Sequence, residues 1–188
     1  MQNNEFAPLI VALKNFSVRG EKKMRKRRDL IDGASYHVTS RTNGKTQVFL
    51  ENLGRKVLLL TIEEAKEKYD FKLHNFCIMT NHFHLLITPV NGTNLSRIVQ
   101  WIKTNSAKRW NCIFKSKDHL WGERFFSRPI KDMNDFYFVK EYIDQNPVKS
   151  GYVKNPQDWK YSGAYYIVNE IEGLVDYNEQ DKQKYYKK

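Results

Sequence analysis

The clearest fold signal in the chain lies in residues 72–88, which read KLHNFCIMTNHFHLLIT. Apolar and aromatic side chains recur through Lys72–Met79 and His82–Thr88, which favours two β-strands. The polar pair Thr80-Asn81 separates these segments, so the strands are expected to be adjacent and antiparallel, as a hairpin. An antiparallel sheet is therefore the framework on which the remaining segments pack.

Upstream of the hairpin, the sequence predicts one more strand and one helix. Tyr36–Thr42 (YHVTSRT) is rich in β-branched and aromatic residues and leads into the turn pair Asn43-Gly44, which indicates a strand. Residues 46–50 suit either another strand or the first turn of a helix. Thr61–Tyr69 predicts a helix with Thr61 as N-cap, because a glutamate follows three residues later in a capping-box pattern.

Downstream of the hairpin, two helices are predicted. Leu95–Trp110 places apolar residues at the i, i+3, i+4 and i+7 positions of one helical face. Lys115–Pro129 is expected to be a loop. Met133–Gln145 predicts a helix that ends before Pro147, since proline disfavours helical geometry in the residue before it. The order of elements predicts an α+β protein, a small antiparallel sheet with helices packed on one face.

Charge is the most distinctive feature of the composition. The 188 residues hold 32 Lys and Arg against 21 Asp and Glu, a formal net charge of +11, and six basic residues fall within Lys22–Arg28. This surplus points to a polyanionic partner, most commonly nucleic acid. We expect three parts: a basic extension (1–28), one domain (29–168) and a charged C-terminal tail (169–188).

Composition also excludes several classes of protein. With 40% hydrophobic and 14% aromatic residues the chain can build a core, so disorder of the whole chain is excluded. Cys77 and Cys112 are too few for a disulfide framework. No apolar run approaches the ~20 residues of a bilayer span. We expect a cytoplasmic protein with no membrane partner, and Met24, inside the basic run, is an alternative start to Met1.

The segment His82-Phe83-His84 is the chemical centre of the sequence. On a strand, residues i and i+2 lie on one face, roughly 7 Å apart at the backbone, while Phe83 points the opposite way. Two imidazoles on one face can hold a divalent ion together. The alternative is a pair of packed or hydrogen-bonded strand histidines. Because Leu85–Ile87 is apolar, polar rings at the end of this strand need partners.

Asn81–Leu86 (NHFHLL) resembles the HUH motif of single-tyrosine transposases, in which a hydrophobic residue stands between two histidines. The similarity is greatest to the bacterial REP-associated or related tyrosine transposases and covers about residues 30–166. Four further segments match in the same order: Tyr36–Arg41 (first strand), Cys77–Asn81 (lead-in to the histidines), Leu120–Arg124 (loop before the nucleophile) and Tyr142–Gly151 (terminal helix and its Asn-Pro stop).

The resemblance implies a ferredoxin-like fold and an enzyme that cuts and rejoins single-stranded DNA, often at hairpin-bearing ends. Such proteins usually act as homodimers and some act as monomers. His82 and His84 would be the ligands of a divalent ion, Mg or Mn, that neutralises charge on the phosphoryl oxygens. A tyrosine hydroxyl would attack phosphorus, giving a 5′-phosphotyrosine link and a free 3′-OH, and this link would preserve the bond energy needed for rejoining.

The chain departs from the family pattern at the nucleophile. The family's tyrosine is expected shortly after the Trp-containing loop, where this chain has Phe125 and Phe126, and phenylalanine has no hydroxyl. Three explanations remain open: Tyr137 or Tyr142 further along the helix serves instead; Ser127 or a metal-bound water attacks; or strand transfer is lost and DNA binding is retained. The polar metal ligand that members carry near their tyrosine also has no assigned counterpart here.

Contacts with DNA are predicted from charge and aromaticity. The basic residues expected to follow a phosphate backbone are Arg41, Lys103, Lys108, Arg109, Arg124, Arg128 and Lys131. Trp121, Phe125 and Phe126 are candidates for stacking on unpaired bases, and the alternative is that these aromatics pack against the sheet. Two other classes stay open: a plain nucleic-acid-binding module on the same fold, which does not need the histidine pair, and a metal-dependent phosphoesterase acting on small nucleotides, which does not need the positive charge.

Overall fold

The structure is a computed structural model that describes residues 30–31 and 33–186. The predicted basic extension, with Lys22–Arg28 and Met24, lies outside these residues. The elements follow in the order β1 (Tyr36–Arg41), a 3-10 helix (Asn43–Lys45), α2 (Asn52–Lys68), β2 (Phe71–Ile78), β3 (His82–Pro89), α3 (Leu95–Phe114), β4 (Phe126–Pro129), α4 (Met133–Lys149), a 3-10 helix (Pro156–Asp158), α5 (Gly163–Val168) and α6 (Glu179–Tyr186).

Four antiparallel strands form one sheet in the order β2-β3-β1-β4. The hairpin predicted around Thr80-Asn81 is the β2–β3 pair, and the predicted first strand is β1, which lies between β3 and β4. The segment expected to be a loop, residues 115–129, contains the short edge strand β4. Its four residues carry too little alternation to identify a strand from sequence.

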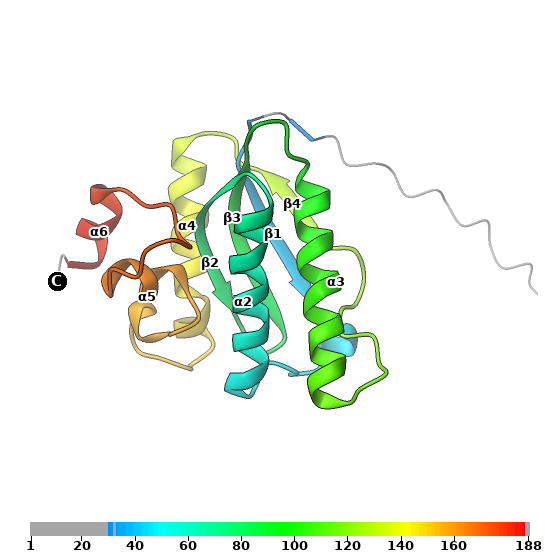
Figure 1. The fold of residues 1–188 in the computed structure, drawn as a ribbon. Coiled ribbons are helices and arrows are strands. Elements are labelled where there is room, and N and C mark those ends of the chain that lie inside the picture. The colour runs from blue at the N-terminus through cyan, green and yellow to red at the C-terminus, as the bar shows by residue number, and fades with distance from the viewer. Residues whose placement is uncertain (1–29, 32, 187–188) are drawn as a thin grey trace, which may run out of the picture.

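Helices cover both faces of this sheet. Leu85 and Ile87 of β3 belong to the main core beneath α2 and α3, whereas Leu86 packs on the opposite face with Val139 and Ile143 of α4. In Figure 1, α2 and α3 lie in front of the sheet and α4 lies behind it. The α+β class with an antiparallel sheet is confirmed. The expectation that helices pack on only one face is corrected: they pack on both. Strand β3 carries apolar side chains on both sides, and each apolar face must be buried against another element.

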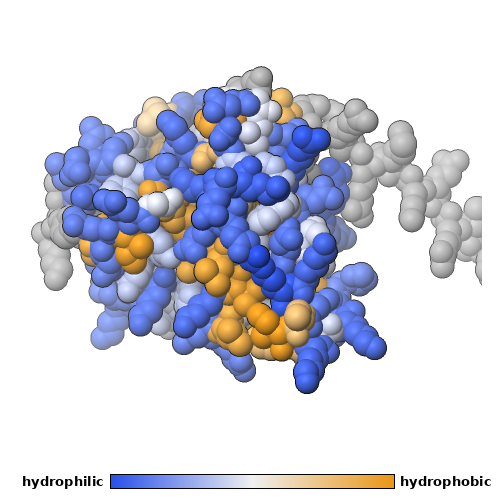
Figure 2. Space-filling view, viewed as in Figure 1, coloured by the Kyte–Doolittle hydropathy of each residue, from blue (hydrophilic) through white to orange (hydrophobic). Residues whose placement is uncertain are grey.

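The α2–α3 face is mostly hydrophilic, with an apolar area at its lower centre in Figure 2. Exposed apolar side chains on these two helices include Leu53, Leu60 and Ile113. Among the described residues, no helix combines the length and the apolar character needed to cross a membrane.

Two predicted helix ends and one connection differ in the structure. Helix α2 begins at Asn52 rather than at Thr61, and Thr61 lies buried inside it, where its hydroxyl donates to the carbonyl of Val57 (2.7 Å). A mid-helix threonine commonly bonds the carbonyl four residues earlier, so the apparent cap was misleading. Helix α4 continues through Pro147 to Lys149, since a proline in the last turn removes few helical bonds. Residues 46–50 form neither a strand nor a helix.

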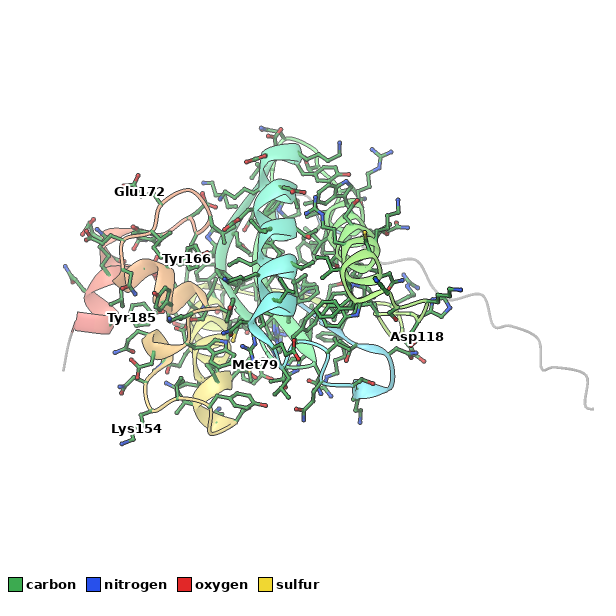
Figure 3. All side chains as sticks on the ribbon, turned by 60° about the horizontal axis from the view of Figure 1, so that its bottom comes forward. Met79, Asp118, Lys154, Tyr166, Glu172 and Tyr185 are labelled. Atoms are coloured by element: carbon green, nitrogen blue, oxygen red, sulfur yellow. The ribbon has the colours of Figure 1, made fainter. Side chains whose placement is uncertain are left out.

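The C-terminal segment packs against the domain instead of forming a separate tail. Leu174 and Val175 are buried in the main core, and Asp181 of α6 forms an ion pair with the buried Lys140 of α4. In Figure 3, Tyr185 of α6 lies on the opposite side of the molecule from Asp118, which marks the loop after α3. Residues beyond the boundary expected at residue 168 thus contribute an apolar pair to the main core and a charge that complements Lys140.

Candidate active site

His82 and His84 lie at the start of β3, on the face of the sheet that α4 covers. His82 and His84 meet edge to face, with ring centroids 4.9 Å apart, as expected for residues i and i+2 of a strand. The neighbouring strand β1 places Arg41 opposite His82 and Thr39 opposite His84. Directly opposite residues project to the same face, so these four side chains form one polar cluster.

In both histidines, the Nδ1 nitrogen has a hydrogen-bond partner within the protein. Nδ1 of His84 lies 3.0 Å from the Thr39 hydroxyl and 3.0 Å from Nε2 of His37, while Nδ1 of His82 donates to the Asn81 side-chain carbonyl (2.7 Å). Nε2 of His84 is buried and has no hydrogen-bond partner within the described part of the chain. A fixed Nδ1 proton sets the tautomer in which Nε2 carries the lone pair that can bind a metal.

Burial keeps these imidazoles neutral. Desolvation lowers the pKa of His82 and of His37 to about 4, with Arg41 adding to the effect on His82 and Arg128 to that on His37. The pKa of His84 is lowered well below its ordinary value, first by burial and then by His82. A neutral imidazole is the form that ligates a metal, so the electrostatics of the cluster fit a metal site at neutral pH.

Tyr142 of α4 is the tyrosine that the fold brings to the histidines. Its ring meets His84 edge-on at 5.6 Å between centroids and His37 at 5.7 Å, and 38% of the residue stays exposed. Helix α4 is fixed by Val139 and Ile143, which pack against the sheet on either side of Tyr142 in sequence. Tyr137 is five residues away, about 140° around the helix, and packs against Phe136 instead.

The two phenylalanines at the expected tyrosine position lie in different surroundings. Phe125 is buried in the main core. Phe126 is in β4, directly opposite Thr39 in β1, so it shares the histidine face, and 58% of it is exposed. Ser127, the other nucleophile considered, is opposite Val38. Val38 belongs to the main core, so Ser127 lies on the face away from the histidines.

Sequence reasoning missed two polar side chains in this region, His37 and Asn146. His37 lies beside His84. The sequence feature that could have identified it is its i, i+2 spacing from Thr39 in the first strand, which places both side chains on one face. Asn146 lies one helical turn after Tyr142, and its amide nitrogen donates to the Tyr142 carbonyl (2.7 Å), a bond that does not use the amide oxygen. Among the described residues, no group of three or more His, Cys, Asp or Glu side chains forms a metal site.

Some of the predicted DNA-contacting residues lie near the histidines. Arg41 and Arg124 border an open groove of about 1050 Å³ that also includes Thr39 and Phe126. Arg128 of β4 makes two hydrogen bonds to the Asp135 carboxylate at the start of α4 (2.6 and 2.9 Å), which holds that end of the helix over the sheet.

The other predicted residues lie elsewhere or have intramolecular partners. The Lys103 ammonium donates to the Glu123 carbonyl (2.8 Å), and Arg109 pairs with Glu64 of α2 (2.5 Å). Lys108 lines a shallow hollow on the outer side of α3, and Lys131 is exposed after β4. The predicted set therefore does not form one continuous groove, since α3 directs its basic side chains away from the histidine face.

An antiparallel sheet with paired histidines on a central strand and a tyrosine on the covering helix defines a transposase-like α+β domain. A family model described as "Transposase IS200 like" matches residues 31–146. The chain belongs to this family of IS200-like transposases, and the resemblance found in the sequence is confirmed.

Individual relatives agree with this assignment. A Haemophilus influenzae protein named as a REP-associated tyrosine transposase is 30% identical over 149 residues, which cover 74% of this chain and 84% of the relative. A REP-associated tyrosine transposase of Escherichia coli is 27% identical over 135 residues, covering 63% and 76%. A solved structure of a REP-associated tyrosine transposase bound to a REP hairpin superposes with a TM-score of 0.65 at 26% identity, covering 80% and 87%.

Proposed function

We propose that this protein cleaves and rejoins single-stranded DNA beside a hairpin, with Tyr142 as the nucleophile. The observation that carries the proposal is the contact between the half-exposed Tyr142 ring and His84, whose buried Nε2 has no hydrogen-bond partner among the described residues. The hairpin DNA bound to the solved relative supports the choice of substrate. The positive charge of the chain fits a polyanionic partner of this kind.

The donor atoms fit a divalent ion. His82 and His84 offer neutral Nε2 atoms, and the amide oxygen of Asn146, one turn beyond Tyr142, is our candidate for the polar ligand that the sequence left unassigned. A bound Mg or Mn ion would neutralise charge that develops on the phosphoryl oxygens. In the tautomer that binds a metal through Nε2, His84 would donate its Nδ1 proton to Thr39 or His37, which lie 3.0 Å away.

The chain's own groups account for the rest of the reaction. The Tyr142 oxygen forms a bond to phosphorus and loses its proton, while the bond from phosphorus to the 3′ oxygen breaks and that oxygen gains a proton. The products are a 5′-phosphotyrosine link and a free 3′-OH, and the reverse reaction joins strands. Arg41, opposite His82, is placed to contact the phosphate and position it for attack.

A non-cleaving nucleic-acid-binding protein remains the alternative function. It rests on the phenylalanines at the position where the family pattern led us to expect the tyrosine. The position of Tyr142 beside His84 favours cleavage over this alternative, because it supplies a hydroxyl where the phenylalanines cannot.

The test is an adduct assay. Labelled single-stranded hairpin DNAs from sequence flanking the gene are incubated with Mn or Mg, and products are run on a denaturing gel with and without protease. We expect a protease-sensitive adduct with the wild type and with Tyr137→Phe, the matched control on the same helix. Tyr142→Phe and the His82→Ala/His84→Ala double variant should form none.

Each other outcome has a definite meaning. An adduct with Tyr142→Phe would show that another residue attacks. Metal-dependent cutting without an adduct would identify water as the nucleophile. Binding without cleavage across the substrate set would support the alternative function.

A further inference from the structure

Two large aromatic side chains are exposed beside the histidine site and have no part in the proposed chemistry. Phe126 of β4 is 58% exposed and Phe138 of α4 is 69% exposed. Exposed apolar rings at one place on a surface commonly mark a contact with a ligand or partner. Their position relative to Tyr142 indicates which ligand they fit.

Phe126 lies on the histidine face of the sheet. It is directly opposite Thr39, and the Thr39 hydroxyl bonds Nδ1 of His84, so both side chains project to the same side. Phe126 also lines the open groove that Arg41 and Arg124 border. The ring therefore lies within a basic groove at the Arg41 end of β1, beside the loop that precedes β4.

Phe138 belongs to the same face of α4 as Tyr142. Asp135, Phe138 and Tyr142 follow at spacings of three and four residues, which places them along one stripe of the helix. One end of the stripe is fixed to β4 by the Arg128–Asp135 pair, and the other end meets His37 and His84 through Tyr142. Phe138 lies between these two anchors on the stripe, and we infer from this spacing that it projects from α4 on the β1–β4 side of the histidine face.

The chemistry of the surroundings selects the ligand. Arg41, Lys45 and Arg124 line the groove together with a single acidic residue, Glu123. Cationic groups bind phosphates at any sequence, and exposed aromatic rings stack on bases that are not paired. A duplex hides its base faces, so this combination suits a single strand.

We propose that Phe126 and Phe138 are stacking platforms for the unpaired bases on either side of the cleaved phosphate. The inference rests on the proposed function, because it takes the phosphate to lie between Tyr142 and the histidines. It also gives a role to Phe126, which occupies a position expected for the nucleophile: the residue binds a base instead of attacking phosphorus.

The test measures binding separately from cleavage. Phe126→Ala and Phe138→Ala are made in the Tyr142→Phe background, and dissociation constants are measured for a hairpin with single-stranded flanks and for the same hairpin without flanks. Each substitution should weaken binding of the flanked hairpin about 5- to 150-fold, the range that stacking on one base provides. Binding of the blunt hairpin should not change.

Four controls make the result specific to stacking. Tyr137→Ala, an exposed aromatic on another face of α4, should leave both constants unchanged, and Phe126→Trp should retain flank binding. A 2-aminopurine in the flank should be quenched by the Tyr142→Phe protein and released from quenching by Phe126→Ala. An abasic flank should bind the Phe126→Ala protein no more weakly than an intact flank.

Several outcomes would overturn the inference. Equal loss of affinity for blunt and flanked hairpins would make the rings structural. A change in sedimenting mass on Phe138→Ala, with flank affinity unchanged, would assign this surface to a second copy of the chain. The proposed function fails separately: the wild type would then form no adduct even though Phe126 and Phe138 bind the flank.

Discussion

The docking of the C-terminal segment predicts a large effect from a single substitution, Asp181→Asn. Its partner Lys140 has a side chain only 1% exposed, and the Asp181 side chain is 10% exposed. Removing one member of a buried ion pair costs about 3–5 kcal/mol, because the remaining charge has no compensation. We expect the lower end, about 3 kcal/mol, since the buried Asp144 lies one helical turn from Lys140 and reduces the penalty.

Urea unfolding followed by tryptophan fluorescence measures this effect. The midpoint should fall while the slope of the free energy against urea stays unchanged, as expected when stability alone changes. The double variant Lys140→Met/Asp181→Leu should recover part of the loss, because the uncompensated Lys140 ammonium is gone and the buried Asp144 keeps its hydrogen bonds from Asn75 and Tyr185. Glu64→Gln, in the half-exposed pair with Arg109, is the control and should cost less than about 1 kcal/mol.

If Asp181→Asn lowers the free energy of unfolding by less than about 1 kcal/mol, the reasoning fails. Residues 169–186 would then act as the loose tail that the sequence suggested.

Two further predictions concern pH and DNA binding. Burial lowers the pKa of His74 from 6.5 to about 4, so the unfolded chain binds more protons than the folded protein between these pH values. The free energy of unfolding should therefore fall as the pH drops from about 6.5 to about 4. His74→Gln should remove up to about 3 kcal/mol of this loss, measured in acid unfolding curves. Arg41→Ala should reduce the salt dependence of hairpin affinity by about 0.7 in log–log slope, whereas Arg109→Ala should leave it unchanged, because Glu64 already pairs with that arginine.

Local patterns predicted the sheet and the histidine pair well. The hairpin, β1 and α3 each have a clear periodicity, and the i, i+2 spacing is sufficient to place His82 and His84 on one face. The start of α2 was missed because Thr61 looks like a cap yet bonds a carbonyl of its own helix. The docked C-terminus was missed because the partner of Asp181 is Lys140, a residue 41 positions earlier that no short-range pattern connects to it.

The candidate nucleophile could not be located from its distance along the sequence, because the fold decides which side chain reaches the histidines. Distance in sequence from the Trp-containing loop favoured Phe125 or Phe126, but β4 occupies that stretch, and a strand alternates its side chains between the core and the groove. The first side chain able to return to His84 must come from the element that covers the histidine face, which is α4. On that helix, the packing of Val139 and Ile143 fixes the rotation, and this rotation turns Tyr142 rather than Tyr137 toward the imidazoles. The same constraint leaves Phe126 in the groove, where it can contact a base but can never supply the attacking oxygen.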